Sequence, residues 1–172
     1  MQRRSAIKNL TMAMGGLLSL PSWASGWTPD SIGSVSMLSF NEENTLAEIV
    51  ETIIPETNTP GAKSLKVHQF AMRMVNDCYA EAAQQSFKQG LKTTDDAAQK
   101  AYSKGFVECT PQQRLELLKQ LSASSDTNAK QFVNTIKNLT IQGYMNSEYV
   151  MVNIQKYNMA PGFYHGCVPV KK

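Results

Sequence analysis

Apolar side chains recur at helical spacing in several separate stretches, and each stretch has its own start or stop signal. The first stretch covers residues 39 to 54 and places five aliphatic side chains on one face: Leu46, Ile49, Val50, Ile53 and Ile54. Ser39 followed by Glu42 has the form of a capping box, and Pro55 ends the run because it has no backbone N–H to donate. We therefore predict an amphipathic helix between Ser39 and Pro55.

A loop and a second helical stretch follow. The segment 55–61, PETNTPG, contains two prolines without backbone donors and a glycine suited to a turn, which predicts an ordered loop. From Leu65 onward apolar residues again share one face, and Ala- and Gln-rich sequence extends the helical propensity to about Phe87. The residues on this face are Val67, Phe70, Met74 and Cys78. The pattern over residues 89–105 is weaker and assigns no element.

Two more helices are predicted in the second half of the chain. Thr110, Pro111 and Gln113 combine a capping box with a proline at the first helical position. They lead into a leucine-rich stretch: Leu115, Leu117, Leu118 and Leu121. After a polar break over residues 122–128, apolar positions repeat at three and four from Ala129 to Tyr144, which we expect to be the longest buried helix. No stretch alternates long enough to predict a sheet, so the predicted fold class is all-α, a single-domain helical bundle over residues 39–172.

Both sides of this bundle lack a helical period. Residues 25–38 are rich in Ser and Gly and contain Pro29, which indicates a flexible or partner-docked N-terminal arm. In the last 30 residues Pro and Gly interrupt a crowd of aromatic and Met side chains, which predicts an irregular C-terminal loop. We expect most of these side chains in the core, with burial against a partner as the alternative: Met145, Tyr149, Met151, Tyr157, Met159, Phe163 and Tyr164.

Residues 1–24 have the three-part pattern of a twin-arginine signal peptide. Arg3 and Arg4 precede an apolar run of about a dozen residues, well short of the roughly 18 to 20 that span a bilayer. Small residues at positions 22 and 24 predict cleavage between Ala24 and Ser25. An amphipathic surface helix, the alternative, needs a charged face, and residues 9–24 contain no charged side chain. We therefore expect the twin-arginine translocase to export this chain, folded, to the periplasm.

Removal of this leader changes the charge balance. The chain has 17 basic and 14 acidic residues, and three basic but no acidic residues lie in the leader, so the mature chain is neutral. No basic cluster is longer than Lys171-Lys172, and the composition therefore argues against nucleic acid or anionic lipid as a partner. The remaining length of about 148 residues fits one domain.

Motifs that would hold a cofactor are missing from the sequence. There is no Gly-rich phosphate or dinucleotide loop, no haem-attachment motif, no His-Glu-x-x-His and no Gly-x-Ser-x-Gly, so we expect no cofactor in this chain. Three cysteines and two histidines could supply metal ligands, but their scattered spacing matches no compact site: Cys78, Cys109, Cys167, His68 and His165. His165 and Cys167 could also form a nucleophilic pair, although the sequence signatures of such sites are missing around them.

The cysteines are better explained by export into an oxidising compartment, where thiols tend to pair. An odd number makes one intrachain disulfide and one unpaired thiol the simplest count. Cys167, in a Gly- and Pro-rich loop, is the candidate for the unpaired thiol. Cys78 lies on an apolar stripe, where a buried free thiol is common, so the pairing stays open.

Three segments give the chain a resemblance to the gluconate 2-dehydrogenase subunit 3 family. They are LAEIVETIIPETNTPG at 46–61 with Val67 and Phe70 after it, LTIQGYMNSEYVM at 139–151, and YNMAPGFYHGCVP at 157–169. The resemblance implies a small, mostly helical, non-catalytic subunit of a periplasmic sugar or sugar-acid dehydrogenase. In such complexes a large flavoprotein of the glucose-methanol-choline type holds FAD and oxidises an alcohol. A cytochrome c subunit, with haem c, often passes the electrons to the membrane.

Together with the export signal, the resemblance implies an escort. Such a subunit would carry a leaderless FAD subunit through the translocase, stay bound as a stabilising partner, and reach the membrane only through its partners. Backbone shape explains the Pro and Gly positions of the three segments better than direct contact does, and capping of a helix break would explain Ser147 and Glu148. The candidate contact residues are Pro55, Glu56, Thr57, Pro60, Gly61, Gly143, Tyr144, Ser147, Glu148, Pro161, Gly162, Tyr164, Gly166, Cys167 and Pro169.

Two other classes of function stay open at this point. A stand-alone enzyme using Cys167 or His165 would need no partner and would lose activity when either residue is replaced. An independent periplasmic binding or adaptor module would be stable alone and would hold a small molecule in a concave apolar pocket.

Overall fold

The computed structural model describes residues 38–158, 160 and 162. The first helix, α3 (Phe40–Ile53), begins at the predicted capping box, where the Glu42 carboxylate accepts the Ser39 N–H at 2.8 Å and Ser39 Oγ accepts the Glu42 N–H at 3.5 Å. The Ser39 N–H and the Ser39 hydroxyl both donate to the Glu42 carboxylate, and they lower the pKa of Glu42. The helix ends just before Pro55, as predicted, and a loop follows it.

Helices make up the rest of the described chain. They are α4 (Val67–Cys78), α5 (Glu81–Tyr102), the 3-10 helix η1 (Phe106–Glu108), α6 (Pro111–Ala123), α7 (Thr127–Met145) and the π-helix η2 (Val150–Ile154). The described residues contain no strand, so the predicted all-α class is confirmed. None of the described helices is both long and apolar enough to cross a membrane.

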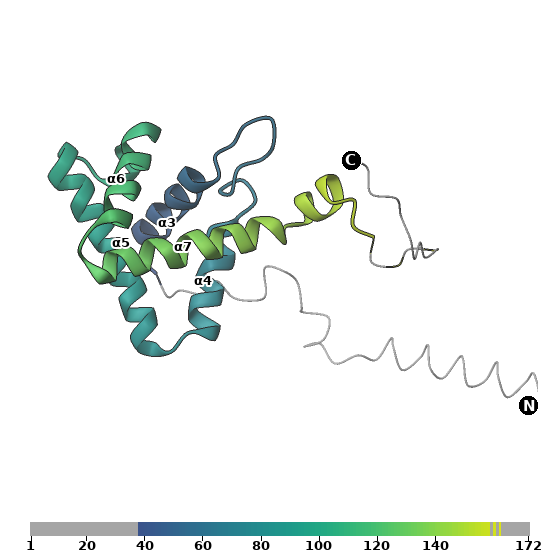
Figure 1. The fold of residues 1–172 in the computed structure, drawn as a ribbon, viewed down its shortest axis with the longest axis horizontal. Coiled ribbons are helices and arrows are strands. Elements are labelled where there is room, and N and C mark those ends of the chain that lie inside the picture. The colour runs from purple at the N-terminus through teal and green to yellow at the C-terminus, as the bar shows by residue number, and fades with distance from the viewer. Residues whose placement is uncertain (1–37, 159, 161, 163–172) are drawn as a thin grey trace, which may run out of the picture. The chain divides into compact units, whose positions relative to one another are not determined.

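Helices α3 and α7 organise the core. Helix α3 contacts each of the other four α-helices and η1, and α7 packs along α4, α5 and α6. In Figure 1, α7 crosses the bundle and continues past the other helices, with η2 beyond its end. The largest fully buried side chains come from most of these elements and form one cluster: Leu46, Ile49, Leu91, Phe106, Leu117 and Ile136.

The predicted helix over residues 65–87 is in fact two helices. Tyr79 and Ala80 are extended, and α5 starts at Glu81. The side-chain amide of Gln84 supports this break, because its Nε2 donates to the Asn76 carbonyl at 2.9 Å and to the Tyr79 carbonyl at 3.0 Å. Carbonyls at the end of α4 are thereby satisfied without a glycine or proline, so the usual stop signals are missing from the sequence.

Helix α5 also fills the stretch where the sequence pattern was weak. With 22 residues it is longer than α7 with 19, whereas residues 129–144 were expected to form the longest buried helix. Helix α7 nevertheless buries more of its residues: Ala129, Phe132, Val133, Ile136, Leu139, Thr140 and Gly143.

The two described cysteines differ from expectation. Cys78 is exposed rather than buried, because α4 ends there and its buried face runs through Val67, Ala71 and Val75. Cys109 is the buried one, and burial raises the pKa of its thiol. Both thiols are free, so no disulfide joins them. Cys167 lies outside the described residues.

The interpretation of the C-terminal aromatic and Met side chains as core also fails for the part that is described. Met145 and Tyr157 are exposed, and Tyr149 and Met151 are half-buried. Val150 is the buried residue of η2. Other predictions fall outside the described residues: Arg3, Arg4, the Ala24–Ser25 cleavage site, the arm before Leu38, Met159, Phe163 and His165.

Candidate functional site

The loop after α3 is held in shape by one carboxylate. Glu51, in the last turn of α3, accepts the Glu56 N–H at 2.8 Å with Oε1 and the Lys63 N–H at 2.9 Å with Oε2. Hydrogen bonds to a charged acceptor are among the stronger ones, so they fix both ends of the segment 55–63 against α3. The loop predicted from its prolines is therefore an ordered structure.

Within this loop the predicted contact residues divide by exposure. Pro55, Glu56 and Thr57 are exposed, whereas Pro60 is half-buried and Gly61 is buried. The Ser64 hydroxyl donates to Glu56 Oε2 at 2.8 Å and the Thr57 N–H donates to the Thr59 carbonyl at 3.0 Å. The exposed half of the loop is thus rigid and available to another molecule.

The second predicted motif lies against this loop. Tyr144, near the end of α7, donates its hydroxyl to the Pro60 carbonyl at 3.0 Å, across 84 residues of sequence. Gly143 beside it is buried, and a Cβ atom there would lie 2.6 Å from Phe70 Cδ1 and 2.9 Å from Val67 Cγ1. Only a glycine lets α4 approach α7 this closely. Val67 and Phe70 are the residues that follow the first motif, so the two motifs form one surface.

Ser147 and Glu148 take different roles at the end of α7. The Ser147 hydroxyl donates to the Tyr144 carbonyl at 2.7 Å and accepts the Val150 N–H at 3.4 Å. It therefore joins the end of α7 to η2, which is the capping role considered from the sequence. Glu148 is exposed. Gly143 and Ser147 therefore shape the backbone, whereas the exposed Glu148 side chain is available for contact with a partner.

Exposed apolar side chains continue this surface onto the end of α7 and η2. Five large ones are about half exposed: Ile141, Met145, Val152, Ile154 and Tyr157. Ile141, Val152 and Ile154 were not predicted from the sequence as contact residues. The four-residue spacing of Ile141 and Met145, off the buried stripe of α7, was the available signal. The third motif is described only at Gly162, which is exposed, and its other predicted residues lie outside the described part: Pro161, Tyr164, Gly166, Cys167 and Pro169.

An ion-pair network also holds the loop after α3 in place. The Arg114 guanidinium pairs with Glu48, and both side chains are only 14% exposed. Lys63 Nζ lies 2.5 Å from the second oxygen of Glu48. Arg114 also donates to the carbonyls of Phe106 and Val107. The network joins α3, the loop, η1 and α6, and nothing in the sequence pattern indicates it.

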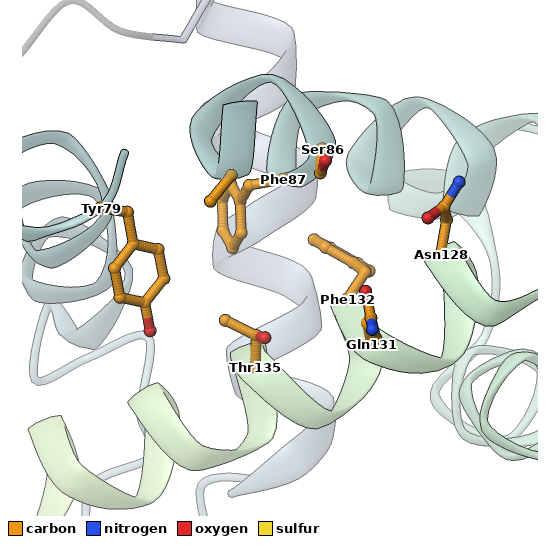
Figure 2. A pocket seen from close by; sticks show the side chains of 8 residues that line it. Tyr79, Ser86, Phe87, Asn128, Gln131, Phe132 and Thr135 are labelled. Atoms are coloured by element: carbon orange, nitrogen blue, oxygen red, sulfur yellow. The ribbon is translucent and has the colours of Figure 1, made fainter. Parts of the chain in front are cut away.

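A small cavity lies between the start of α5 and one side of α7, and Figure 2 shows the side chains that line it. Phe87 and Phe132 meet there edge to face, with ring centres 5.2 Å apart. Its volume is about 150 Å³ and its lining holds no charged side chain, whereas ligand pockets usually measure about 300 to 1,000 Å³. The described residues also contain no group of three or more potential metal ligands.

The fold holds the His68 side chain, near the start of α4, largely out of water, with 12% of it exposed. Its Nδ1 is buried without a hydrogen-bond partner among the described residues, and its Nε2 lies 3.8 Å from Glu43 Oε1. Burial lowers the pKa of His68 below its ordinary value of 6.5, helped by Lys63 and Lys66 and opposed by Glu43. The fold therefore favours the neutral ring.

We expect this ring to make stability depend on pH. The unfolded chain binds a proton at His68 near pH 6.5 more readily than the folded chain does, so stability is full above that pH and is lost as the pH falls below it. One such group contributes a slope of at most about 1.4 kcal/mol per pH unit. Urea unfolding at pH 5, 6 and 7 should show a flatter profile for His68→Gln than for the unchanged chain. Equal slopes would contradict the prediction.

One comparison with known proteins found a match, and the matched range contains the joined motifs. Residues 41–162 match the family model described as gluconate 2-dehydrogenase subunit 3. The match includes both joined motifs and the first part of the third. No curated protein and no solved structure matches the chain.

Proposed function

Because the chain belongs to the gluconate 2-dehydrogenase subunit 3 family, we propose that it is a non-catalytic subunit that binds and stabilises a leaderless FAD subunit of a periplasmic dehydrogenase. The observation that carries the proposal is the family match over residues 41–162. The substrate would be a sugar or sugar acid, oxidised on the FAD of the large subunit, and a cytochrome c subunit with haem c would accept the electrons. This chain contributes by contact.

The surface formed by the two motifs suits such a role. Its exposed residues, Glu56, Thr57 and Glu148, are carried on segments fixed by Glu51, Tyr144 and Ser147. Rigid segments lose little conformational entropy when they bind, which favours a lasting complex. The exposed apolar side chains at the end of α7 and in η2 supply area of the kind that stable interfaces bury.

The predicted twin-arginine leader explains why the dehydrogenase would need this additional subunit. The twin-arginine pattern at Arg3 and Arg4 is typical of proteins exported in the folded state, and this chain has no cofactor motif of its own. A flavoprotein must fold around its cofactor, so a partner that brings FAD would require this route. The chain thus lends its leader to the large subunit and stays bound to it in the periplasm.

Replacing Arg3 and Arg4 by lysine is expected to leave the flavoprotein in the cytoplasm. The experiment fractionates cells that make both proteins and measures flavin-dependent dehydrogenase activity in periplasm and cytoplasm. The control exchanges Lys171 and Lys172 for arginine, which makes the same kind of change outside the leader. A flavoprotein that still reaches the periplasm with the lysine pair contradicts the escort role. Failure of the purified chain to bring down a flavoprotein contradicts the subunit role.

A further inference from the structure

A groove follows α6 on the side that faces the end of α3. It consists of two hollows of about 510 and 430 Å³, which adjoin because Thr52 and Leu115 line both. Ile53, Leu118 and Val133 give the larger hollow an apolar lining. Leu115, which lines both hollows, is 44% exposed, so part of its apolar surface is available for contact. We call these two hollows the α6 groove.

Opposite charges line the two halves of the α6 groove. Glu51 and Glu56 line the hollow beside the first turn of α6 together with Arg114, whose charge is paired with Glu48, and Lys119 and Lys137 line the hollow beside its later turns. Apart from Arg114, none of these side chains takes part in an ion pair among the described residues. Leu115 lies between the two halves, one helical turn before Lys119. The groove is therefore acidic at one end, apolar in the middle and basic at the other.

We propose that the α6 groove is a self-association surface that pairs two copies of this chain about a twofold axis near Leu115. In a twofold interface the same patch faces itself in the opposite direction. The acidic end of each copy then meets the basic end of the other, so that Glu56 of one copy faces Lys119 of its partner and the two Leu115 side chains meet. The groove is therefore complementary in charge to a second copy of itself that runs in the opposite direction.

The charges favour a second copy over other occupants. A small apolar ligand would leave Glu56, Lys119 and Lys137 without an ion-pair partner, whereas a second copy brings an opposite charge to each end. Glu51 already accepts two backbone N–H groups of the loop, so Glu56 is the carboxylate available for this contact. The mature chain predicted from the leader is neutral, so no net repulsion opposes association of two copies. Tyr144 and Glu148 line neither hollow, so among the candidate contact residues of the two motifs only Pro55 and Glu56 line the α6 groove.

Sedimentation of the full chain at about 1 to 200 µM, the range in which weak dimers dissociate, tests the proposal. We expect a dimer whose dissociation constant rises at least about tenfold in Leu115→Asp, because two carboxylates would meet at the axis. Ile141→Asp is the matched control, since Ile141 is 43% exposed and lies outside the groove. It should sediment as the unchanged chain does, and thermal unfolding of both variants shows that they are folded.

A charge exchange makes the test specific for a twofold arrangement. Glu56→Lys alone and Lys119→Glu alone should each weaken the dimer, because like charges then face each other twice. A mixture of the two variants should regain the affinity, since each reversed residue faces the reversed residue of its partner. A monomeric unchanged chain, or a mixture no tighter than either variant alone, would overturn the proposal.

The same variants distinguish self-association from binding of the large subunit at the α6 groove. If the unchanged chain is monomeric and Leu115→Asp lowers recovery of the flavoprotein, the groove binds the large subunit and the self-association proposal is wrong. The proposed function is tested separately by export, because sedimentation uses this chain alone.

Discussion

Replacing Arg114 by alanine is expected to lower the free energy of unfolding by about 3 to 5 kcal/mol, the usual cost of removing one partner from a buried ion pair. The guanidinium pairs with Glu48, donates to the Phe106 carbonyl at 3.1 Å and to the Val107 carbonyl at 2.5 Å. It also lies 5.9 Å from the centre of the Phe106 ring. Alanine would leave Glu48, which is 14% exposed, with Lys63 as its remaining cation. Urea unfolding followed by circular dichroism measures the loss.

Two further variants separate charge from geometry. Arg114→Lys keeps the charge but cannot serve Glu48 and two carbonyls at once, so we expect an intermediate loss. Replacing both Glu48 and Arg114 by methionine should cost less than the sum of the single changes, because no buried charge is then left alone. A loss below about 1 kcal/mol for Arg114→Ala would be the value of a surface ion pair and would contradict the burial of this network.

Local signals in the sequence predicted local structure well. The capping boxes at Ser39 and at Thr110 both form, with Gln113 Oε1 accepting the Thr110 N–H at 2.9 Å. Both depend on side chains three residues apart, so the sequence contains all that is needed. Glu48 and Arg114 are 66 residues apart, and their pairing depends on how α6 is placed against α3. No pattern of helical spacing contains that information.

The sequence was sufficient to identify residues of the candidate site, but it indicated only some of their roles. The Pro and Gly positions of the first two motifs were identified, and the shaping roles considered for Gly143 and Ser147 agree with the structure. The hydrogen bond from Tyr144 to the Pro60 carbonyl, which joins the motifs, requires the tertiary fold. The burial expected for Cys78 is wrong because the helix ends at that residue, and spacing alone does not locate the end.

Residues 89–105 show why a correct helix can escape prediction. Gly90 is poor in a helix by about 1 kcal/mol relative to alanine, and it weakens the pattern at the point where α5 continues. In the structure Gly90 is buried, and a Cβ atom there would lie 2.3 Å from Cγ and Cδ2 and 2.7 Å from Cβ of Phe132 on α7. The residue that weakens the local signal is thus the one that lets α5 and α7 approach.

Gly90→Ala is therefore expected to destabilise the fold by about 2 kcal/mol, although alanine is the better helix former. The gain in helix propensity is about 1 kcal/mol, and overpacking a core costs about 1 to 3 kcal/mol or more, with the upper end suited to a contact as short as 2.3 Å. The clash involves Cβ and Cγ of Phe132, which lie close to the α7 backbone, so a rotation of the ring alone does not relieve it. Urea unfolding measures the change.

The test depends on the sign of the change in the free energy of unfolding, and a second glycine provides the control. Gly105 has φ −63, which alanine adopts readily, and a Cβ there would meet only Asp95 Oδ1 at 3.4 Å. Gly105→Ala should leave stability unchanged or raise it, because it limits the unfolded chain without a clash. Combining Gly90→Ala with Phe132→Leu should recover part of the loss if the ring is the obstacle. A Gly90→Ala variant as stable as Gly105→Ala would mean that α5 and α7 lie farther apart than described here.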